Sequence, residues 1–405
     1  MRELLLAARE NIADKTDAAS PCAVHRLRLS NFRNYEQLAL DISAPVVILN
    51  GANGAGKTNL LEAISFLSPG RGLRRARLRD VQLREVQNNG AADTADTADA
   101  GWAVAATVAA PMGPVNIGSS LTKTENGGDR RVARHDGTAM APAGLAALVG
   151  VQWLTPQMDR LFQDGPSSRR RFLDRLVLGL DPDHGRRVGA YERSMRERAK
   201  LLRDAASNDP AWLGALEARM AADGVAVAAA RREALARLQR LLAETPGCFP
   251  RPGLAIEGRL ESWLAEHPAV EVESRFAVLL AENRRRDGEA GGTGDGPHRS
   301  DLSVRHLDKD QAAGLCSTGE QKALLISVIL ANARAEAQRR GAAPILLLDE
   351  VAAHLDQTRR EALFDEILAL GGQTWLSGTD RELFTALSGQ AQFVVVENGH
   401  ALVER

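Results

Sequence analysis

Cysteine, long apolar segments and excess charge are all scarce in this sequence, and each scarcity excludes a class of function. The three cysteines, Cys22, Cys248 and Cys316, are odd in number and lack metal-ligand spacing, so a reducing compartment such as the cytoplasm is expected. No apolar run reaches the length of a membrane-spanning helix, so no membrane partner is expected. The net charge of −1 gives no overall attraction to nucleic acid, so any DNA contact must come from a local basic patch.

Two segments have the composition of chain that does not pack into a core. Residues 1–22 carry acidic side chains and lack an apolar stretch followed by a cleavage site, so they are interpreted as a flexible N-terminal extension and not as a secretory signal. Residues 88–100 are rich in Ala, Asp, Thr, Asn and Gly, which predicts a disordered surface loop.

A complete phosphate-binding pattern occupies residues 51–58, which read Gly-Ala-Asn-Gly-Ala-Gly-Lys-Thr. Glycines let consecutive amides point at phosphate oxygens, Lys57 would reach the β- and γ-phosphates, and the Thr58 hydroxyl would ligate Mg²⁺. An apolar run at 45–50 and a helical period over 59–67 flank the pattern, which favours a nucleotide site over a Gly-rich turn. The predicted nucleotide contacts are Gly51, Ala52, Asn53, Gly54, Ala55, Gly56, Lys57, Thr58 and Asn59.

An apolar run that ends in two acids lies far downstream of this pattern. Residues 345–348 are typical of a central strand in a parallel sheet, and Asp349 and Glu350 follow directly. Asp349 is predicted to hold Mg²⁺ together with Thr58, and Glu350 to act as the general base toward the attacking water. A separate segment, Ser317-Thr318-Gly319-Glu320-Gln321, opens an apolar helix whose capped N-terminus offers free amides to an anion.

The spacing of these motifs predicts an insertion. Asp349 lies 292 positions after Lys57, which is more chain than a compact P-loop fold needs. Residues 167–290 show helical periodicity and resemble an antiparallel helical hairpin or short coiled coil, although residues 247–260 interrupt it. We therefore expect an α/β head built from two halves, residues 23–166 and 291–405, with an inserted helical arm domain at 167–290.

A basic segment and a glutamine are weaker signals. Five of the nine residues from Arg71 to Arg79 are arginines, which indicates either a solvated face or contact with nucleotide or DNA phosphates. Gln157 lies in the segment 151–159, predicted as a strand that runs into a proline turn, and is a candidate contact for Mg²⁺ and water, although a surface glutamine often has no such role. The predicted DNA contacts are Arg74, Arg75, Arg77 and Arg79.

Taken together, the motifs resemble the RecF family of DNA replication and repair proteins, from about Val24 to Glu404. The Ser317–Gln321 segment also resembles the signature motif of ABC-type ATPases. The Gly-Pro-His-Arg stretch at 296–299 and the short arm separate the RecF family from the structural maintenance of chromosomes proteins. The segments that carry the resemblance are Leu29–Tyr35, Gly51–Asn59, Thr155–Gln157, Arg169–Asp174, Gly296–Leu302, Ser317–Gln321, Asp349–Glu350 and Leu355–Asp356.

The resemblance implies a fold, an activity and partners. It implies an ABC-type P-loop ATPase head that binds ATP and Mg²⁺, forms a homodimer on ATP, and hydrolyses ATP slowly when stimulated by DNA. It also implies binding to duplex DNA and single/double-strand junctions, and action with RecR and RecO to direct RecA to single-strand gaps.

The resemblance also assigns roles to individual residues. Residues 317–321 would contact the nucleotide of the other copy, and Asp356 would be the D-loop acid. Many ABC-type ATPases have a switch histidine where this chain has Ser377-Gly378-Thr379-Asp380, so Thr379 or a water would sense the γ-phosphate. The predicted catalytic residues are Lys57, Gln157 and Glu350, the predicted metal ligands are Thr58, Gln157 and Asp349, and further predicted nucleotide contacts are Arg33 and Asn34.

Two alternatives remain open from the sequence. A transporter-type ABC ATPase would share the phosphate-binding, acidic and signature motifs, but would not need an insertion of this length between Gln157 and Ser317. A small-molecule kinase with a P-loop would not need the signature helix. Salt-dependent binding to duplex DNA would argue against the transporter-type ATPase. ATP-induced dimerisation that is lost in Lys57→Ala would argue against the kinase.

Overall fold

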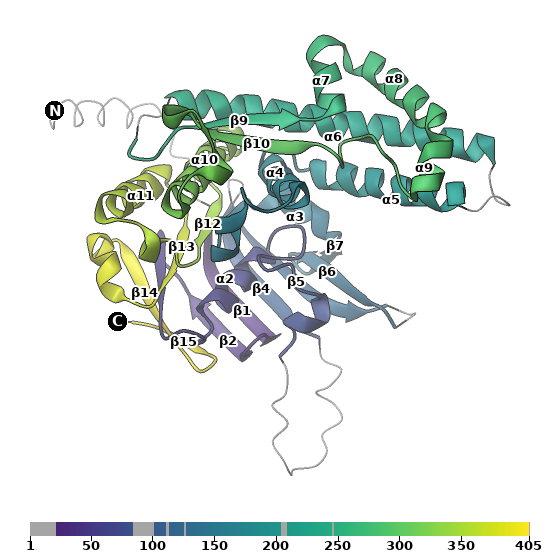
Figure 1. The fold of residues 1–405 in the computed structure, drawn as a ribbon. Coiled ribbons are helices and arrows are strands. Elements are labelled where there is room, and N and C mark those ends of the chain that lie inside the picture. The colour runs from purple at the N-terminus through teal and green to yellow at the C-terminus, as the bar shows by residue number, and fades with distance from the viewer. Residues whose placement is uncertain are drawn as a thin grey trace.

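The computed structural model describes residues 22–83, 101–110, 113–124, 127–203, 209–244 and 247–404. The prediction of a flexible extension over residues 1–22, apart from Cys22, which is buried, and that of a disordered loop at 88–100 lie outside the described residues. The described chain forms a head with two six-stranded sheets, and an arm of helices α4 to α9 that lies along one side of the head (Figure 1).

The first sheet is antiparallel and comes from the N-terminal part of the chain. Its strands alternate buried and exposed residues, as expected when one face packs on a core. In that core Trp102 packs against Phe32 and Phe66, with ring centroids 5.7 and 4.8 Å apart. In spatial order the strands are β2 (Tyr35–Asp41), β1 (Ala23–Phe32), β4 (Ala103–Ala110), β5 (Gly113–Lys123), β6 (Asp129–His135) and β7 (Thr138–Met140).

The second sheet joins the two halves of the sequence, as the sequence analysis predicted. All neighbouring strands are parallel except β15, which pairs antiparallel with β14. The central strands are buried along almost their whole length, which explains their continuous apolar runs. The spatial order is β15 (His400–Val403), β14 (Ala391–Glu397), β3 (Val46–Asn50), β13 (Thr374–Gly378), β12 (Ile345–Leu348) and β8 (Val151–Leu154).

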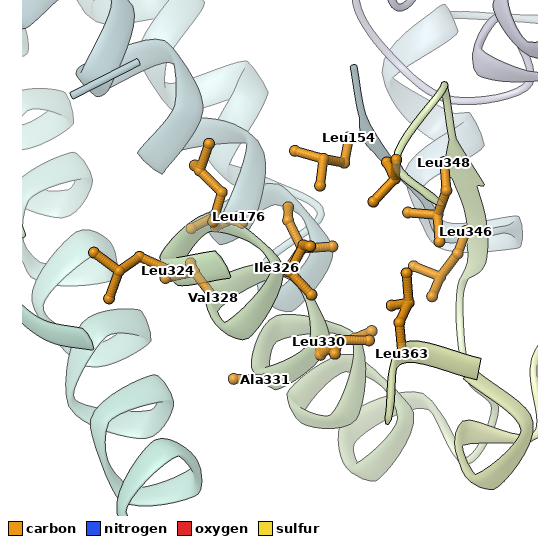
Figure 2. Packing of buried hydrophobic residues seen from close by; sticks show 14 of the residues in the cluster. Leu154, Leu176, Leu324, Ile326, Val328, Leu330, Ala331, Leu346, Leu348 and Leu363 are labelled. Carbon is orange, nitrogen blue, oxygen red and sulfur yellow. The ribbon is translucent and has the colours of Figure 1, made fainter. Parts of the chain in front are cut away.

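Helices cover this sheet, and α10 (Thr318–Arg340) is buried without a break from Gln321 to Ala333. Figure 2 shows Ile326 of α10 between Leu176 and the β12 side chains Leu346 and Leu348, with Leu330 near Leu363. A helix that is apolar on most of its faces is expected in the interior of a larger domain. The other helices of the head are α2 (Lys57–Ser65), α3 (Leu145–Leu148) and α11 (Gln357–Leu370), with 3-10 turns that include η1 (Leu78–Val81), η3 (Pro156–Arg160), η7 (Ala352–His354) and η8 (Arg381–Leu387).

The arm is helical, with one departure from the prediction. Its longest helix, α6, has 35 residues and is therefore about 50 Å long. The interruption predicted at 247–260 contains a strand, β9 (Pro252–Glu257), which pairs antiparallel with β10 (Asp301–His306). β10 thus belongs to a separate small sheet, in which it lies between β9 of the arm and β11 (Gln311–Ala312). The helices are α4 (Pro166–Leu180), α5 (His184–Arg203), α6 (Pro210–Glu244), α7 (Arg259–Glu266), α8 (Ala269–Glu282) and α9 (Arg284–Ala290).

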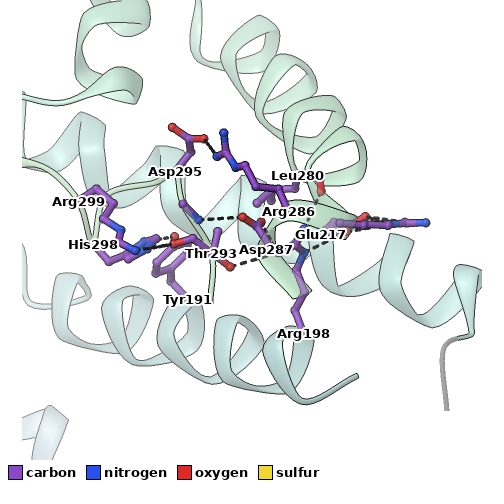
Figure 3. Close-up of polar contacts among 12 residues, drawn as sticks. Tyr191, Arg198, Glu217, Leu280, Arg286, Asp287, Thr293, Asp295, His298 and Arg299 are labelled. Atoms are coloured by element: carbon purple, nitrogen blue, oxygen red, sulfur yellow. Dashed lines mark hydrogen bonds and ion pairs between the residues drawn. The ribbon is translucent and has the colours of Figure 1, made fainter. Parts of the chain in front are cut away.

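A polar network ties the arm helices to the segment that returns to the head (Figure 3). Arg198 is fully buried and binds Glu217 at 3.0 Å and Asp287 at 2.8 Å. His298, from the Gly-Pro-His-Arg stretch, has Nε2 at 2.9 Å from the Thr293 carbonyl and Nδ1 at 2.7 Å from the Tyr191 hydroxyl. A carbonyl only accepts, so Nε2 carries the proton and Nδ1 accepts from the tyrosine.

Candidate nucleotide site and its surroundings

The loop between β3 and α2 has the backbone that the phosphate-binding pattern requires. Gly54 and Gly56 have φ angles of 81° and 119°, a region that favours glycine. At Gly56 a Cβ would also lie 2.5 Å from Asn34 Nδ2 and 2.7 Å from Tyr35 Oη, so the close approach excludes any side chain. Tyr35 and Asn34 hold the loop by donating to the carbonyls of Gly56 and Ala55, each at 3.1 Å. Asn34, a predicted nucleotide contact, therefore shapes the loop.

Lys57 folds back into this loop. Its Nζ donates to the Gly51 carbonyl at 2.6 Å and to the Ala52 carbonyl at 2.9 Å. Burial lowers the pKa of Lys57, while the carboxylates of Glu350 and Asp349 act in the opposite sense. The cation is thus held against the loop, where the motif predicts that it meets phosphate oxygens.

Thr58 and Asp349 meet although they lie 291 positions apart. The Thr58 hydroxyl donates to Asp349 Oδ1 at 3.0 Å, and the Ser377 hydroxyl donates to the same oxygen at 2.7 Å. Burial raises the pKa of Asp349, and the hydrogen bonds from Ser377 and Thr58 partly offset that rise. The parallel strands β3, β13 and β12 bring these residues together because all of them end at the same edge of the sheet.

Ser377 also belongs to this constellation, although it was not among the predicted site residues. Its oxygen also accepts a hydrogen bond from the Glu350 amide at 2.9 Å, and Glu350 has a φ of 53°. Ser377 thereby orients both acids that follow β12. The available signal was its position at the end of the strand between the P-loop strand and the acidic strand. Thr379, expected to replace the switch histidine, is exposed just beyond this strand.

The hydroxyl and carboxylate of Thr58 and Asp349 fit a magnesium ion. Among the described residues no group of three or more His, Cys, Asp or Glu side chains is arranged to hold a metal by itself. Mg²⁺ commonly takes one or two protein oxygens and completes its shell with phosphates and water, which this pair allows. Gln157, the third predicted ligand, is exposed on η3, directly after β8 and next to β12.

Arg33 and Arg74, predicted to contact nucleotide and DNA, share a partner within the chain. Both bind Glu62, a fully buried acid of α2: Arg33 bidentately at 2.8 Å, and Arg74 at 3.2 Å. Arg74 also donates to Asn59 at 2.6 Å. Both guanidinium groups thus neutralise a buried carboxylate of the P-loop helix, and the contacts of Arg33 with nucleotide and of Arg74 with DNA stay predictions.

The remaining arginines of the basic segment divide into two sets. Arg77 is exposed, and Arg79 forms an ion pair with Asp129 across the first sheet. Arg71 and Arg75 line a cavity of about 660 Å³ between the head and the arm.

Two arginines of α4, Arg171 and Arg175, line the same cavity. Burial and the charges of Arg171 and Arg71 lower the pKa of Arg75, because like charges converge there. Arg175 stacks over Trp153 at 4.5 Å, and burial lowers its pKa to about 9.

A capping box opens α10. The Ser317 hydroxyl accepts from the Glu320 amide, and Glu320 accepts in turn from the Ser317 amide at 3.0 Å. An ion pair with Lys309 and these hydrogen bonds lower the pKa of Glu320 to about 2. Ser317, Thr318 and Gly319 face outward at least in part, as a contact with a second copy requires.

Gln321 departs from that expectation. It is 1% exposed and donates to the Cys316 carbonyl at 2.8 Å, so in this structure it is not available to another chain. Its position on the inner face of α10 is the physical reason. Asp356 caps α11 by accepting from the Arg359 amide at 2.9 Å, and its side chain is exposed.

Comparisons with known proteins agree on one family. The family model described as "RecF/RecN/SMC N terminal domain" matches residues 23–400. The chain is 50% identical over 376 residues to the "DNA replication and repair protein RecF" of Rhizobium meliloti (strain 1021), covering 92% of this chain and 97% of that one. It is 48% identical to the protein of the same name from Brucella suis biovar 1 (strain 1330), covering 97% of this chain and 98% of that one.

Solved structures share the fold at low sequence identity. One described as "Structure of the recombination mediator protein RecF-ATP in RecFOR pathway" has a TM-score of 0.79 and 19% identity, covering 96% of this chain and 99% of that chain. An SMC head bound to the C-winged helix domain of ScpA has a TM-score of 0.52 and 17% identity, covering 94% and 96%. In the part of the chain that the structure describes, no helix is long and apolar enough to span a membrane.

Proposed function

The chain belongs to the RecF family of DNA replication and repair proteins, and from that premise we propose that it is an ATP-driven DNA-binding switch. It binds MgATP in the loop at 51–58, forms a dimer when ATP is bound, and binds duplex DNA next to single-strand gaps. The observation that carries the proposal is the meeting of Lys57, Thr58 and Asp349 at one edge of the sheet.

Each residue of the site has a chemical task. Lys57 neutralises the β- and γ-phosphates from within the loop, and the backbone amides of residues 54–58 donate to the same oxygens. Thr58 and Asp349 hold Mg²⁺, which when bound neutralises charge that develops on the phosphates. Glu350 accepts the proton of the attacking water, and Ser377 keeps this acid oriented through its amide. Gln157, at the neighbouring strand end, contacts the same water and ion.

The signature segment completes the site of a second copy. A helix N-terminus with free amides stabilises an anion, and the outward-facing Ser317, Thr318 and Gly319 have no phosphate of their own chain to bind. Two copies therefore bury two nucleotides between the loop of one and the signature of the other, with Asp356 next to the contact.

The DNA surface is proposed at the cavity between head and arm. Arg71, Arg75, Arg171 and Arg175 converge there, and none of them forms an ion pair with a carboxylate among the described residues. Asp164, Asp174 and Glu192 also line this cavity, but Asp174 pairs with His184 and Arg231. The arginines thus remain open to an anion, and the duplex backbone supplies closely spaced phosphates. Through this contact the dimer recognises single/double-strand junctions and, with RecR and RecO, directs RecA to gaps.

Duplex binding with and without ATP across a salt titration tests the proposal. We expect tight binding only with ATP, with a logarithmic affinity that falls linearly with the logarithm of the salt concentration. The double substitution Arg75→Glu and Arg171→Glu should weaken DNA binding about a hundredfold and flatten the slope, with ATP affinity unchanged. Arg285→Glu is the matched control, because the Arg285 side chain is 91% exposed on α9 and pairs with Glu289 of the same helix. Equal duplex affinity with ATP, ADP and no nucleotide would contradict the switch.

A further inference from the structure

Lys322 is a buried cation without a hydrogen bond. It lies in the second turn of α10, five residues after Ser317, and is 3% exposed. Within the described chain its Nζ has no hydrogen-bond partner, and Asp159 Oδ2 is 3.7 Å away. An ammonium group has three donors and is rarely buried without a close partner, so packing alone does not account for a lysine here.

Asp159 belongs to η3, the turn that also carries Gln157. Its Oδ2 faces Lys322, and its Oδ1 is buried without a hydrogen-bond partner in the described structure. α10 packs directly against η3 at this point. The ion pair is therefore a polar contact between the turn of Gln157 and the helix that begins at Ser317.

The same lysine lies within the field of the acids that follow β12. Burial lowers the pKa of Lys322, and Asp159, Glu350 and Asp349 each act in the opposite sense. A charge held in a poorly solvated place responds strongly to the position of its partners, because little water screens the interaction. The electrostatic energy of the Lys322 ammonium therefore depends on where Asp159, Asp349 and Glu350 of its own chain lie.

The inference rests on the proposed function, in which η3 serves the nucleotide of its own chain and Ser317 serves that of the second copy. We propose that the Lys322–Asp159 ion pair couples the two nucleotide sites of the dimer. It transmits the position of η3 at one nucleotide to the N-terminus of α10 at the other. Lys322 is a positioning residue, since it acts on phosphate only through the helix that carries it.

The test uses Lys322→Met, Asp159→Asn and the double variant in the full-length protein. Lys322→Met should leave the thermal unfolding midpoint unchanged or raise it, because it replaces a poorly partnered buried charge with an apolar chain of similar length. Asp159→Asn should lower the midpoint, because the ammonium loses its carboxylate. Adding Lys322→Met to Asp159→Asn should restore it.

Dimerisation is the measurement that separates coupling from a structural role, because a residue that only supports the fold would not change it selectively. Sedimentation with a non-hydrolysable ATP analogue should show that both single variants need about tenfold more protein to dimerise, and that the double variant needs no more than either. Binding of a fluorescent ATP analogue to the isolated chain should stay within about twofold of wild type. The matched control is Arg334→Met. It breaks the ion pair between Arg334, further along α10, and Glu366 of α11, and it should dimerise normally.

The outcomes separate the two proposals. If the wild-type chain stays monomeric with the analogue, the proposed function fails and the coupling fails with it. If the wild type dimerises and all variants dimerise at the same concentration, the coupling alone is overturned. A fall in unfolding midpoint, nucleotide binding and dimerisation together in Lys322→Met would also overturn it, because the residue would then be structural.

Discussion

Glu62 shows how one residue of the P-loop helix depends on distant partners. It is fully buried, and Arg33 and Arg74 neutralise it from two different loops. Arg33 is 18% and Arg74 32% exposed at the side chain, so water screens the pair only in part. The acid therefore links the turn after β1 to the segment after α2.

We expect Glu62→Gln to lower the free energy of unfolding by about 2 kcal/mol, because it leaves two partly buried guanidinium groups without a counter-charge. Urea denaturation measures the change. Glu36→Gln is the matched control, since Glu36 is exposed on β2. A loss no larger than in the control would mean that the arginines find solvent when the carboxylate is removed.

His298 makes the stability of the arm depend on pH. Burial lowers its pKa below the ordinary value of 6.5, so the unfolded chain binds the proton more readily than the folded one. Stability is therefore complete above about pH 6.5 and falls as the pH drops toward the folded pKa. Protonation would also place a donor at Nδ1, where His298 now accepts from Tyr191.

The expected result is a smaller acid-induced fall in the unfolding midpoint for His298→Gln than for wild type, between about pH 7 and pH 5. Glutamine can keep one donor and one acceptor but does not titrate. His400→Gln, at an exposed position on β15, should retain the wild-type pH dependence. An unchanged slope in the His298 variant would show that another group dominates.

At the scale of the element, Arg131 holds the end of the P-loop helix. This buried side chain of β6 donates to the carbonyls of Gly70, at 2.6 Å, and of Ser68, at 2.8 Å, and also to that of Phe66. Burial lowers the pKa of Arg131 to about 10. Carbonyls at a helix C-terminus lack intrahelical donors, and a cation there is also attracted to the negative end of the helix dipole.

Arg131→Met should lower the free energy of unfolding by about 2–4 kcal/mol, because several buried carbonyls lose their donor at once. It should also weaken ATP binding, because α2 carries Lys57 at its other end. Chemical denaturation and nucleotide titration measure the two effects. Arg130→Met, the exposed neighbour on the same strand, should change neither by more than about 0.5 kcal/mol.

At the scale of the whole molecule, the proposed function requires that dimerisation depend on intact ATP. Glu350→Gln preserves the shape of the proposed base but removes its ability to accept a proton. We expect this variant to accumulate as an ATP-bound dimer in sedimentation experiments, with hydrolysis at least a hundredfold slower, about 2.7 kcal/mol in activation free energy. Combining it with Lys57→Ala should restore the monomer. A monomeric Glu350→Gln protein at saturating ATP and Mg²⁺ would disprove the shared site.

The sequence also set limits on what could be predicted at this scale. Apolar runs that end in the P-loop and in Asp349 predicted a head built from both halves of the chain, and the structure confirms that both halves build the second sheet. The order of its strands was not predicted. The pairing of β9 with β10 was not predicted, since neither strand has a distinctive pattern and their partners lie across the arm.

The sequence by itself determined the loop at 51–58, because its glycines and Lys57 act on neighbours a few positions away. It also determined the capping box of α10, which spans only Ser317 to Glu320. Tertiary structure alone decided that Arg74 neutralises Glu62, that Ser377 orients the acids after β12, and that Lys322 faces Asp159. The physical reason is distance along the chain: charge and hydrogen-bonding capacity are visible in a sequence, but the partner of a buried polar group is chosen by how separate elements pack.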